Sequence, residues 1–528
     1  MPLRLTALTA LTSLAAAALL AAGAASAQNL AIGFADPVSS ADPELNNHAG
    51  DRSLALHFWD SIVAARDGGK LDATLAASWR ALDDKTWEFK LKPDVKWQDG
   101  TPFTAEDIVF SFQRARSVPG SVATYAGSLR TVESTVAKDA HTVIVKTTTP
   151  NPMLPQNIAS IYVVSKHIGE KSRTEDYNAG RAMIGTGPYK FVSYVPGDRT
   201  VMERSPNYWG PRPSWEKVTF RYIGNGAART AALLAGDVDV IDKVAVNDVD
   251  KLRKTASVSV YAYPGLRVLL LQPSFKPGPQ EFITDAAGKP LAHNPLTDVR
   301  VRRALSLAIN RKAIVERIMQ GTVTEANQWM PQGSFGYNPE IRNIAHDPEQ
   351  ARKLLAEAGF PQGFQITIHV PGDRYPQAPE TVQAVAQFWS RIGVKTHVQV
   401  VPWSMYSARA IKNEFAVSVI AWGNGTGEAG YGLLQTLATH DPKAGRGANN
   451  WGRYSSEAVD KALDASTVEF NERRREAIFR HAANLVTSDV AQIPLFHYQN
   501  IWAAKKGLKV EPLLSDRTTA MQVTRVGK

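Results

Sequence analysis

The sequence predicts an α/β protein built from more than one domain, and two observations support this. The chain has 528 residues, whereas single hydrophobic cores stop growing at about 250–300 residues, so two or three domains are expected. Between residues 364 and 422, strand-like and helix-like patterns alternate in the order βαβαβ. That order is typical of a parallel sheet whose strands are connected by helices.

Residues 1–27 have the composition of a secretory signal peptide. Arg4 supplies an early positive charge, a run rich in Ala and Leu follows, and Ala25 and Ala27 precede a predicted cleavage site before Gln28. The alternative is an uncleaved membrane anchor, because the apolar run approaches the roughly 17–25 residues that a spanning helix needs. The small residues at the end favour cleavage, so the sequence predicts an exported protein.

The chain contains no cysteine. This excludes disulfides, thiolate metal sites, cysteine nucleophiles and a lipid-modified N-terminal cysteine. An exported protein without a lipid anchor would diffuse freely, which suits a Gram-negative periplasm. The formal net charge is +10, but the basic clusters at residues 299–305 and 471–477 lie beside apolar positions in helix-like contexts. Nucleic-acid binding is not expected, because it would need a basic stripe with stacking aromatics.

Three further helical regions are predicted, two of them from their caps. Thr104 and Asp107 have the spacing of a capping box at a helix start. Asp347 is placed as an N-cap, with Pro348 in the first helical position. Residues 298–321 form a longer helical region with an interruption near its middle.

The segment AWGNGTGEAGYG, residues 421–432, contains a G-x-G-x-x-G pattern directly after a predicted strand. A dinucleotide-binding fold would continue with a solid helix, a second strand and an acidic residue about 20 positions further on. The following residues show neither that strand nor that carboxylate. The pattern is therefore interpreted as a false positive for nucleotide binding.

The same segment has the properties of a ligand-facing loop. In open α/β sheets, ligands bind beyond the carboxyl ends of the strands, and glycines let backbone N–H groups approach a ligand closely. Trp422 would then provide a flat apolar wall, and Asn424, Thr426 and Glu428 would provide hydrogen bonds. The alternative is a tight turn with a tryptophan packed in the core.

No enzyme motif is present. The sequence lacks G-x-x-x-x-G-K-[ST], H-E-x-x-H and G-x-S-x-G, and its 11 histidines show no metal-ligand spacing. The sequence therefore predicts no catalytic residues, no metal and no cofactor.

Residues 75–116, LAASWRALDDKTWEFKLKPDVKWQDGTPFTAEDIVFSFQRAR, carry a family resemblance. They closely resemble the signature region of the large periplasmic solute-binding proteins of ABC importers. These form the dipeptide/oligopeptide-binding cluster, bacterial extracellular solute-binding protein family 5. The match continues in order through residues 185–210, 236–241, 294–321, 450–463 and 493–507. The chain is identified as a member of this family, because several long motifs in the right order make chance implausible.

The resemblance implies a two-lobed α/β fold of the periplasmic-binding-protein, or Venus-flytrap, type. Lobe one would comprise residues 28–265, with a core of residues 28–50 and 186–265 and an extra subdomain at 51–185. Lobe two would comprise residues 266–494, and residues 495–528 would return to lobe one. The implied mechanism is closure of the lobes about a ligand, followed by docking on an inner-membrane permease driven by an ATPase. The implied protein is a monomer that catalyses no reaction.

Positions that match the family's contact regions, together with the loop described above, form the predicted ligand-binding site. They are Asp36, Ser39, Tyr125, Arg374, Trp403, Tyr406, Arg409, Trp422, Asn424, Thr426, Glu428, Phe496 and Tyr498. For each aromatic residue, packing in the core is the alternative interpretation.

The resemblance indicates a peptide ligand, with one departure from the family pattern. Similar peptide binders carry an Asp three residues after the loop tryptophan, which pairs with the peptide's α-amino group, and this chain has Gly425 there. A buried ammonium without a carboxylate is costly, so either Glu428 replaces the Asp or the ligand lacks that amine. Arg374 falls where dipeptide binders place an Arg for the ligand carboxylate, a task that suits its guanidinium fork.

We therefore expect a peptide or a peptide-like, anionic small molecule. Within the family, an opine, glutathione, an amino-acid conjugate or a metal chelate are the alternatives. A sensor subunit that presents its ligand to a membrane receptor, and an exported hydrolase, are alternatives from other classes of protein.

Overall fold

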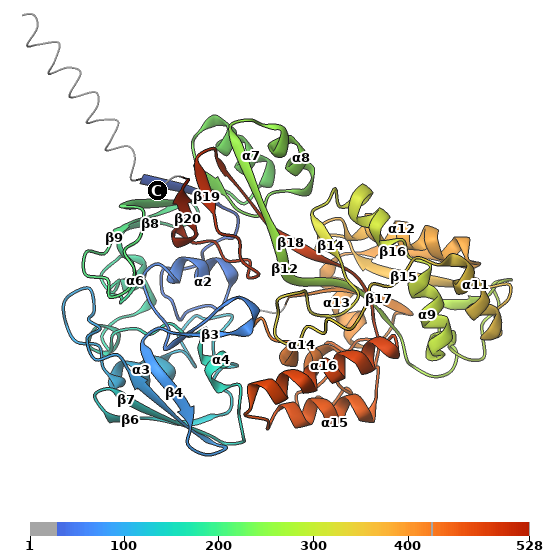
Figure 1. The fold of residues 1–528 in the computed structure, drawn as a ribbon, viewed down its shortest axis with the longest axis horizontal. Coiled ribbons are helices and arrows are strands. Elements are labelled where there is room, and N and C mark those ends of the chain that lie inside the picture. Colours follow the sequence, from blue (N-terminus) through green and yellow to red (C-terminus); the bar gives the residue numbers. More distant parts are fainter. Residues whose placement is uncertain (1–28, 424–425, 527–528) are drawn as a thin grey trace, which may run out of the picture.

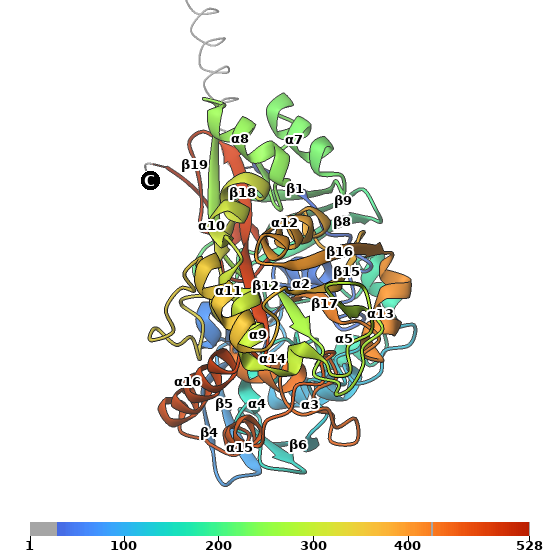
Figure 2. The ribbon, with the colours of Figure 1, turned by 90° about the vertical axis from the view of Figure 1, so that its right-hand side faces the viewer.

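The computed structural model describes residues 29–423 and 426–526. It has two α/β lobes, joined by two long strands that run side by side from one lobe into the other (Figures 1 and 2). These crossover strands are β12 (Val258–Pro273) and β18 (Ile493–Lys505), which pair antiparallel. The predicted leader and Asn424 lie outside the described residues.

Lobe one consists of a core and an attached subdomain. The core contains β1 (Asn29–Phe34), α2 (Ala49–Ala55), β8 (Tyr189–Val195), β9 (Arg199–Arg204), β10 (Lys217–Tyr222), α7 (Gly226–Ala235), β11 (Val240–Ile241), α8 (Val246–Lys254), β19 (Leu508–Val510) and β20 (Val523–Arg525). The subdomain contains β2 (Val63–Ala65), β3 (Leu71–Ala73), β4 (Ala76–Ala81), β5 (Thr86–Leu91), α3 (Ala105–Arg114), β6 (Val132–Asp139), β7 (Thr142–Thr147), α4 (Leu154–Ile158), α5 (Lys166–Gly169) and α6 (Thr174–Asn178). In the core, β1 pairs in parallel with β10 and β11. The subdomain has its own antiparallel sheet in the order β4-β5-β7-β6, against which α3 packs.

Lobe two is built around β15 and its neighbours. Its strands are β13 (Ile283–Asp285), β14 (Val323–Glu325), β15 (Phe364–Pro371), β16 (Val394–Val401) and β17 (Val417–Gly423). Its helices are α9 (Val299–Leu307), α10 (Arg311–Ala313), α11 (Pro348–Glu357), α12 (Ala378–Arg391), α13 (Trp403–Ile411), α14 (Ala429–Thr436), α15 (Glu457–Ser466) and α16 (Glu472–Ser488). The sheet of lobe two is continuous with that of lobe one through the order β15-β17-β12-β18-β11-β1.

The lobe-two part of β12 is buried on both faces. Val268 and Leu270 belong to one hydrophobic cluster, and Leu269 and Leu271 belong to another on the opposite face of the sheet. A strand buried in this way reads as an unbroken apolar run rather than an alternating one. The crossover strand is therefore fixed in lobe two by packing on both sides.

The predicted two-lobed α/β architecture with its extra subdomain is confirmed, and so are its main elements. Helix α3 begins after Thr104, whose backbone N–H donates to Asp107 at 2.9 Å. Asp347 accepts from the N–H of Gln350 at the start of α11. The βαβαβ order appears as β15-α12-β16-α13-β17, with β15 parallel to both β16 and β17. The prediction of a parallel sheet is incomplete, because β17 pairs antiparallel with the crossover strand β12.

The predicted boundaries between the lobes fall inside the two crossover strands. Residue 265 lies in β12 and residue 494 lies in β18. Since each strand belongs to both lobes, the exact boundary residues stay a prediction. In the described part of the chain, no helix is both long and apolar enough to cross a membrane.

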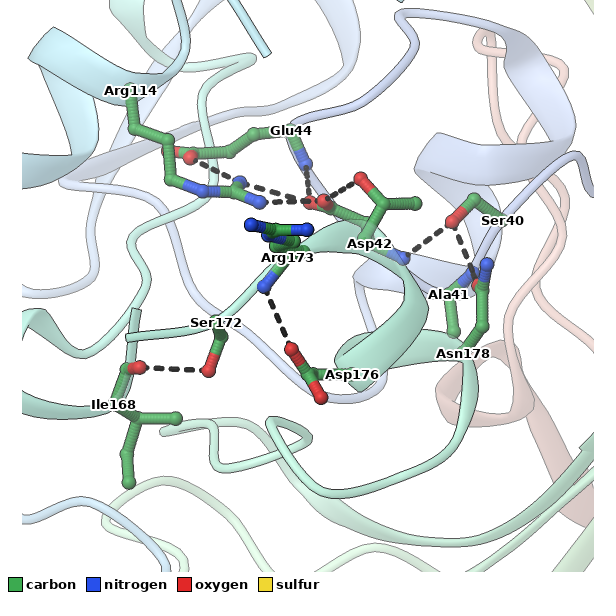
Figure 3. A network of polar contacts seen from close by, with 11 residues as sticks. Ser40, Ala41, Asp42, Glu44, Arg114, Ile168, Ser172, Arg173, Asp176 and Asn178 are labelled. Carbon is green, nitrogen blue, oxygen red and sulfur yellow. Dashed lines mark hydrogen bonds and ion pairs between the residues drawn. The ribbon is translucent and has the colours of Figure 1, made fainter. Parts of the chain in front are cut away.

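A buried polar network fastens the subdomain to the core of lobe one (Figure 3). Arg114 on α3 donates to Asp42 with both terminal nitrogens, at 2.9 and 2.5 Å, and to Glu44 at 2.8 Å. Thr174 on α6 donates its hydroxyl to Asp42 at 2.8 Å. The side chains of Asp42 and Glu44 are fully buried, so removing the guanidinium would leave them without their cation.

One guanidinium in this network faces two carboxyl groups. Asp42 receives the two-pronged bond, whereas Glu44 receives a single one. Burial raises the pKa of Glu44 to about 8, although Arg114 acts in the opposite direction, and the neighbouring Asp42 adds to the rise. Glu44 therefore holds a proton in the folded protein at neutral pH.

We predict that Glu44→Gln flattens the pH dependence of stability between about pH 5 and pH 8. The folded state keeps a proton on Glu44 up to about pH 8, whereas the unfolded state, with the usual pKa of 4.5, releases it. The free energy of unfolding of the wild type must therefore fall as the pH rises through this window. Between these pH values, the wild-type Tm should fall at least about 2–4 °C further than that of the variant, the shift that roughly 1 kcal/mol produces.

Melting followed by circular dichroism measures this difference. Glu133 is exposed, so Glu133→Gln is the matched control and should behave as the wild type. Equal slopes of Tm against pH for the wild type and Glu44→Gln would contradict the prediction.

Candidate ligand-binding cleft

A cavity of about 730 Å³ lies where the two lobes meet the crossover strands. Lobe one contributes Ala49, Arg52 and residues 242–247 to its lining, and the tail of the chain contributes residues 514–518. Lobe two contributes Gln377 and Gly423, and the crossover strands contribute residues 266–267 and 498–502. The volume lies within the range of about 300–1,000 Å³ that is usual for small-molecule sites.

The pairing of the crossover strands is broken at this cavity. Pro264 pairs with Gln499, and the next pair is Val268 with His497, so residues 265–267 bulge against Tyr498 alone. A side chain at Gly265 would place its Cβ 2.7 Å from the carbonyl oxygen of Tyr498. The close approach of the two strands therefore requires glycine there, and the bulge puts Arg267 into the cavity.

The charged residues of the lining are mostly cationic. They are Arg52, Lys243, Arg267 and Arg517, against Asp242 and Asp516. Lys243 is neutralised, because its ammonium binds both carboxylate oxygens of Asp36 at 2.7 Å and lies 3.7 Å from Asp516.

Asp242 takes part in the structure of lobe one. It accepts from the backbone N–H of Ala35 at 2.8 Å and from the hydroxyl of Thr518 at 3.2 Å. Burial raises its pKa to about 6, partly opposed by Lys243 and Arg229. Its carboxyl group is therefore already hydrogen-bonded to protein atoms in the wall of the cavity.

Arg267 reaches from the bulge towards the end of β17. Its Nη1 donates to the carbonyl oxygen of Ala421 at 3.2 Å. Its Nη2 would lie 2.9 Å from a Cβ at Gly423, so the guanidinium occupies space that only a glycine leaves free. Arg267 forms no ion pair with any residue of the described chain.

Of the residues predicted from the sequence, Tyr498 lines the cavity and Asp36 lies behind its wall. The Tyr498 hydroxyl donates to the carbonyl oxygen of Pro376, which also lines the cavity, at 3.0 Å. Burial raises the pKa of Tyr498. Asp36 contributes to the cavity only indirectly, through its ion pair with Lys243, which lines it.

At the end of β17 and in the loop after it, some residues face the cavity and others pack inside lobe two. Gly423 lines the cavity, and Trp422 packs between Trp329 and Tyr431, with ring centroids 6.4 and 6.2 Å away. The backbone N–H of Glu428 donates to the hydroxyl of Thr426 at 3.4 Å. Asn424 is outside the described residues.

Glu428 does not line the cavity. Its side chain is 2% exposed, and its backbone bridges Phe335 within lobe two. Burial raises its pKa to about 7 despite the opposing influence of Arg475 on α16. The sequence could not reveal this, because the loop's glycines suggested exposure, whereas the tertiary structure places Glu428 beside Phe335 and Arg475.

Three predicted aromatic residues lie in the core. Tyr125 and Phe496 are 1% and 0% exposed. Tyr406, also fully buried, donates to the carbonyl oxygen of Val419 at 2.9 Å and accepts from its N–H at 2.6 Å. For these residues the packing interpretation describes the structure.

The remaining predicted residues lie outside the cavity lining, with polar or stacking partners of their own. Ser39 donates its N–H and its hydroxyl to Asp51, both at 2.7 Å. Arg409 pairs with Glu414 at 2.9 Å. Arg374 is exposed, with its guanidinium 5.0 Å from the ring centroid of Trp403. It precedes Pro376 and Gln377, which do line the cavity.

Sequence reasoning missed Lys243 and Arg267. Lys243 follows the short strand β11 by two positions, so the rule that ligands lie beyond strand ends could have found it. Arg267 lies inside a continuous strand-like run, and only the pairing register of β12 with β18 shows that it bulges. Among the described residues, no group of three or more His, Cys, Asp or Glu side chains could hold a metal ion.

The subdomain of lobe one touches lobe two beside the cavity. At the tip of the β2–β3 hairpin, a Cβ at Gly68 would lie 2.4 Å from the carbonyl oxygen of Gly333. A Cβ at Gly69 would lie 3.0 Å from that of Gly427. All four glycines have positive φ. The two backbones therefore approach more closely than side chains would allow.

Comparisons with known proteins agree with this architecture. A family model described as bacterial extracellular solute-binding proteins, family 5 (middle), matches residues 70–444. Heme-binding protein A of Haemophilus influenzae is 28% identical over 464 residues, 83% of this chain and 81% of that protein. The dipeptide-binding protein of Escherichia coli is 25% identical over 469 residues, 83% of this chain and 84% of that protein.

A solved structure gives the same result at the level of the fold. The unliganded open form of the periplasmic murein tripeptide-binding protein MppA is similar to this chain, with a TM-score of 0.81 and 25% identity. The similarity covers 94% of this chain and 97% of that one. Both lobes and the crossover strands therefore have counterparts in a solved structure.

We predict that Gly427→Ala holds the two lobes further apart. The new Cβ would lie 2.8 Å from the backbone nitrogen of Gly69, on a residue with a φ of 72°. Gly120→Ala is the matched control, because its φ is 83° and no described atom lies within 4 Å of the Cβ position. Small-angle X-ray scattering should give a larger radius of gyration for Gly427→Ala than for the wild type and Gly120→Ala. Identical radii in folded samples of all three would contradict the prediction.

Proposed function

The chain belongs to the bacterial extracellular solute-binding proteins of family 5, and from this premise we propose that it captures a peptide or peptide-like solute for an ABC importer. The cavity between the lobes is the observation that carries the proposal. It lies at the crossover strands, takes residues from both lobes and has the volume of a small-molecule site. A ligand held there would contact both lobes at once.

The class of ligand is proposed from the relatives and from the polarity of the cavity. One relative is named as a dipeptide-binding protein and a structural neighbour as a murein tripeptide-binding protein. Besides its charged residues, the lining offers Asn47, Gln377 and Gln499. Amide side chains of this kind can donate to and accept from the backbone of a short extended peptide.

The proposed mechanism is closure of the lobes about the bulge in β12. Residues 265–267 leave the ladder with β18, but Arg267 still pairs with Gly423 of β17, so the bend would fall at residues 265 and 266, which pair with neither strand. A ligand stabilises the closed state only by the contacts that it gains on closure. Residues from the lobe-one wall and from Gly423 of lobe two would provide those contacts.

We assign three of the residues predicted from the sequence to this mechanism. Tyr498 would contact the ligand from the second crossover strand, and Asp36 would hold Lys243 in place. Arg374 would act from the loop that precedes Gln377 at the rim of the cavity. The buried Tyr125, Tyr406, Phe496 and Glu428 would act in packing.

The proposal also includes the route of the protein and its partners. Its relatives include periplasmic binding proteins, so we place this protein in the periplasm, exported by a cleaved leader and free of a lipid anchor. A closed monomer would dock on an inner-membrane permease driven by a cytoplasmic ATPase. The chain would bind and release its solute without making or breaking a bond.

Mass spectrometry of the solute released from natively purified protein tests the proposal. We predict a single class of short peptide or peptide-like molecule, close to one per protein chain. Refolded, emptied protein should bind the same molecule again and return it uncleaved. A cleaved product, or protein that holds no solute and rebinds none, would contradict the proposal.

A further inference from the structure

The cavity contains arginines whose charge the protein does not neutralise. Of its two carboxylates, Asp242 bonds within lobe one, and Asp516 lies 3.7 Å from Lys243, whose charge Asp36 already neutralises. Asp516 therefore offsets at most one of the three arginines. Arg52, Arg267 and Arg517 form no ion pair with any described residue. A cation in a partly desolvated cavity is unfavourable without an anion.

These arginines come from different parts of the fold. Arg52 lies on α2 and Arg517 lies in the tail, and both belong to the lobe-one wall. Arg267 lies on the bulge between the lobes, with its guanidinium against the end of β17 in lobe two. Closure therefore brings like charges towards one another, and an anion between them would convert that repulsion into attraction.

The surroundings of Arg267 keep its guanidinium available. One nitrogen is held by the carbonyl oxygen of Ala421 at 3.2 Å, which fixes the direction of the side chain. Gly423 leaves the space that the other terminal nitrogen occupies, since a Cβ would lie 2.9 Å from it. Arg267 is exposed, so the remaining donors of the fork can reach a ligand. A planar fork of this kind suits a carboxylate.

We infer that the solute bound in this cleft carries a carboxylate, and that Arg267 binds it from the bulge in β12. This rests on the proposed function and adds the residue that selects the acidic group of the ligand. Because the bulge is also the point of bending, recognition of the anion and closure of the lobes occur at the same place. A neutral solute would leave the arginines to repel one another and would favour the open state.

Calorimetric titration with three peptides at pH 7 tests the inference. Trialanine has a terminal carboxylate, trialanine amide has none, and Ala-Ala-Glu amide has only a side-chain carboxylate. The wild type should bind at least one of the two acids tenfold or more tightly than trialanine amide. The acid that binds identifies the source of the carboxylate. Equal affinity for all three would overturn the inference and leave the proposed function standing.

Two variants show whether Arg267 is responsible. Arg267→Gln should lose tenfold or more in affinity for the preferred acid and should no longer distinguish it from the amide. Gly423→Ala retains all charges but displaces the guanidinium, so it should reduce the same affinity. Arg352→Gln removes an exposed arginine of α11 and is the matched control, with unchanged affinities expected. Unchanged acid binding by folded Arg267→Gln would overturn the inference.

A second readout separates this inference from the proposed function. If the wild type binds none of the three peptides, mass spectrometry of the solute captured in the periplasm tests the inference instead. An acidic, non-peptide solute that is present in Arg352→Gln and lost from Arg267→Gln would support the inference while contradicting the peptide class. A solute without an acidic group, or one that Arg267→Gln retains, would overturn it. Wild-type protein that captures nothing would contradict both.

Discussion

The interruption of the ladder between β12 and β18 is the local constraint on which the rest of the structure depends. These strands carry the chain between the lobes, and both are fixed at their ends by packing and pairing. At residues 265–267 they lose regular register, and Gly265 lets them approach where another residue would clash. The cavity lies at this interruption. We propose that the same few residues determine where the protein bends and where the solute is held.

The lining of the cleft carries more cationic than anionic side chains. In the network that fastens the subdomain, Arg114 is matched by Asp42, and Glu44 is kept neutral by burial. In the wall of the cavity, Lys243 is matched by Asp36. The arginines that line the cavity have no such match among the described residues. Arg311 in lobe two is also buried without an ion pair to any described residue, but the carbonyl oxygens of Pro494 and Ser306 and the Ser306 hydroxyl accept from its guanidinium. The arginines of the cavity keep donors that an anionic ligand would satisfy.

Much of the fold could be predicted because its signals are local. Thr104 and Asp347 mark the starts of their helices as N-cap residues. Hydrophobic periodicity identifies the strands and helices from β15 to β17. The proposed binding residues could not be found in the same way. Tyr406 and Glu428 have polar groups at apparently exposed positions, but tertiary packing buries both. In the sequence, Arg267 lies within a strand-like pattern. Its exposure depends on the pairing register of β12 with β18, whose residues lie more than two hundred positions away. Family resemblance gave the architecture, whereas the proposed contacts required three-dimensional pairing.

The most direct test of this account is a crystal structure of the protein purified with the solute that it captures in the periplasm. Electron density for the solute is expected between the lobes, against the bulge of β12, with an acidic group at the guanidinium of Arg267. The solute is also expected to touch residues of both lobes. Density for the solute elsewhere on the molecule, or in the cleft with a neutral group facing Arg267, would contradict this expectation.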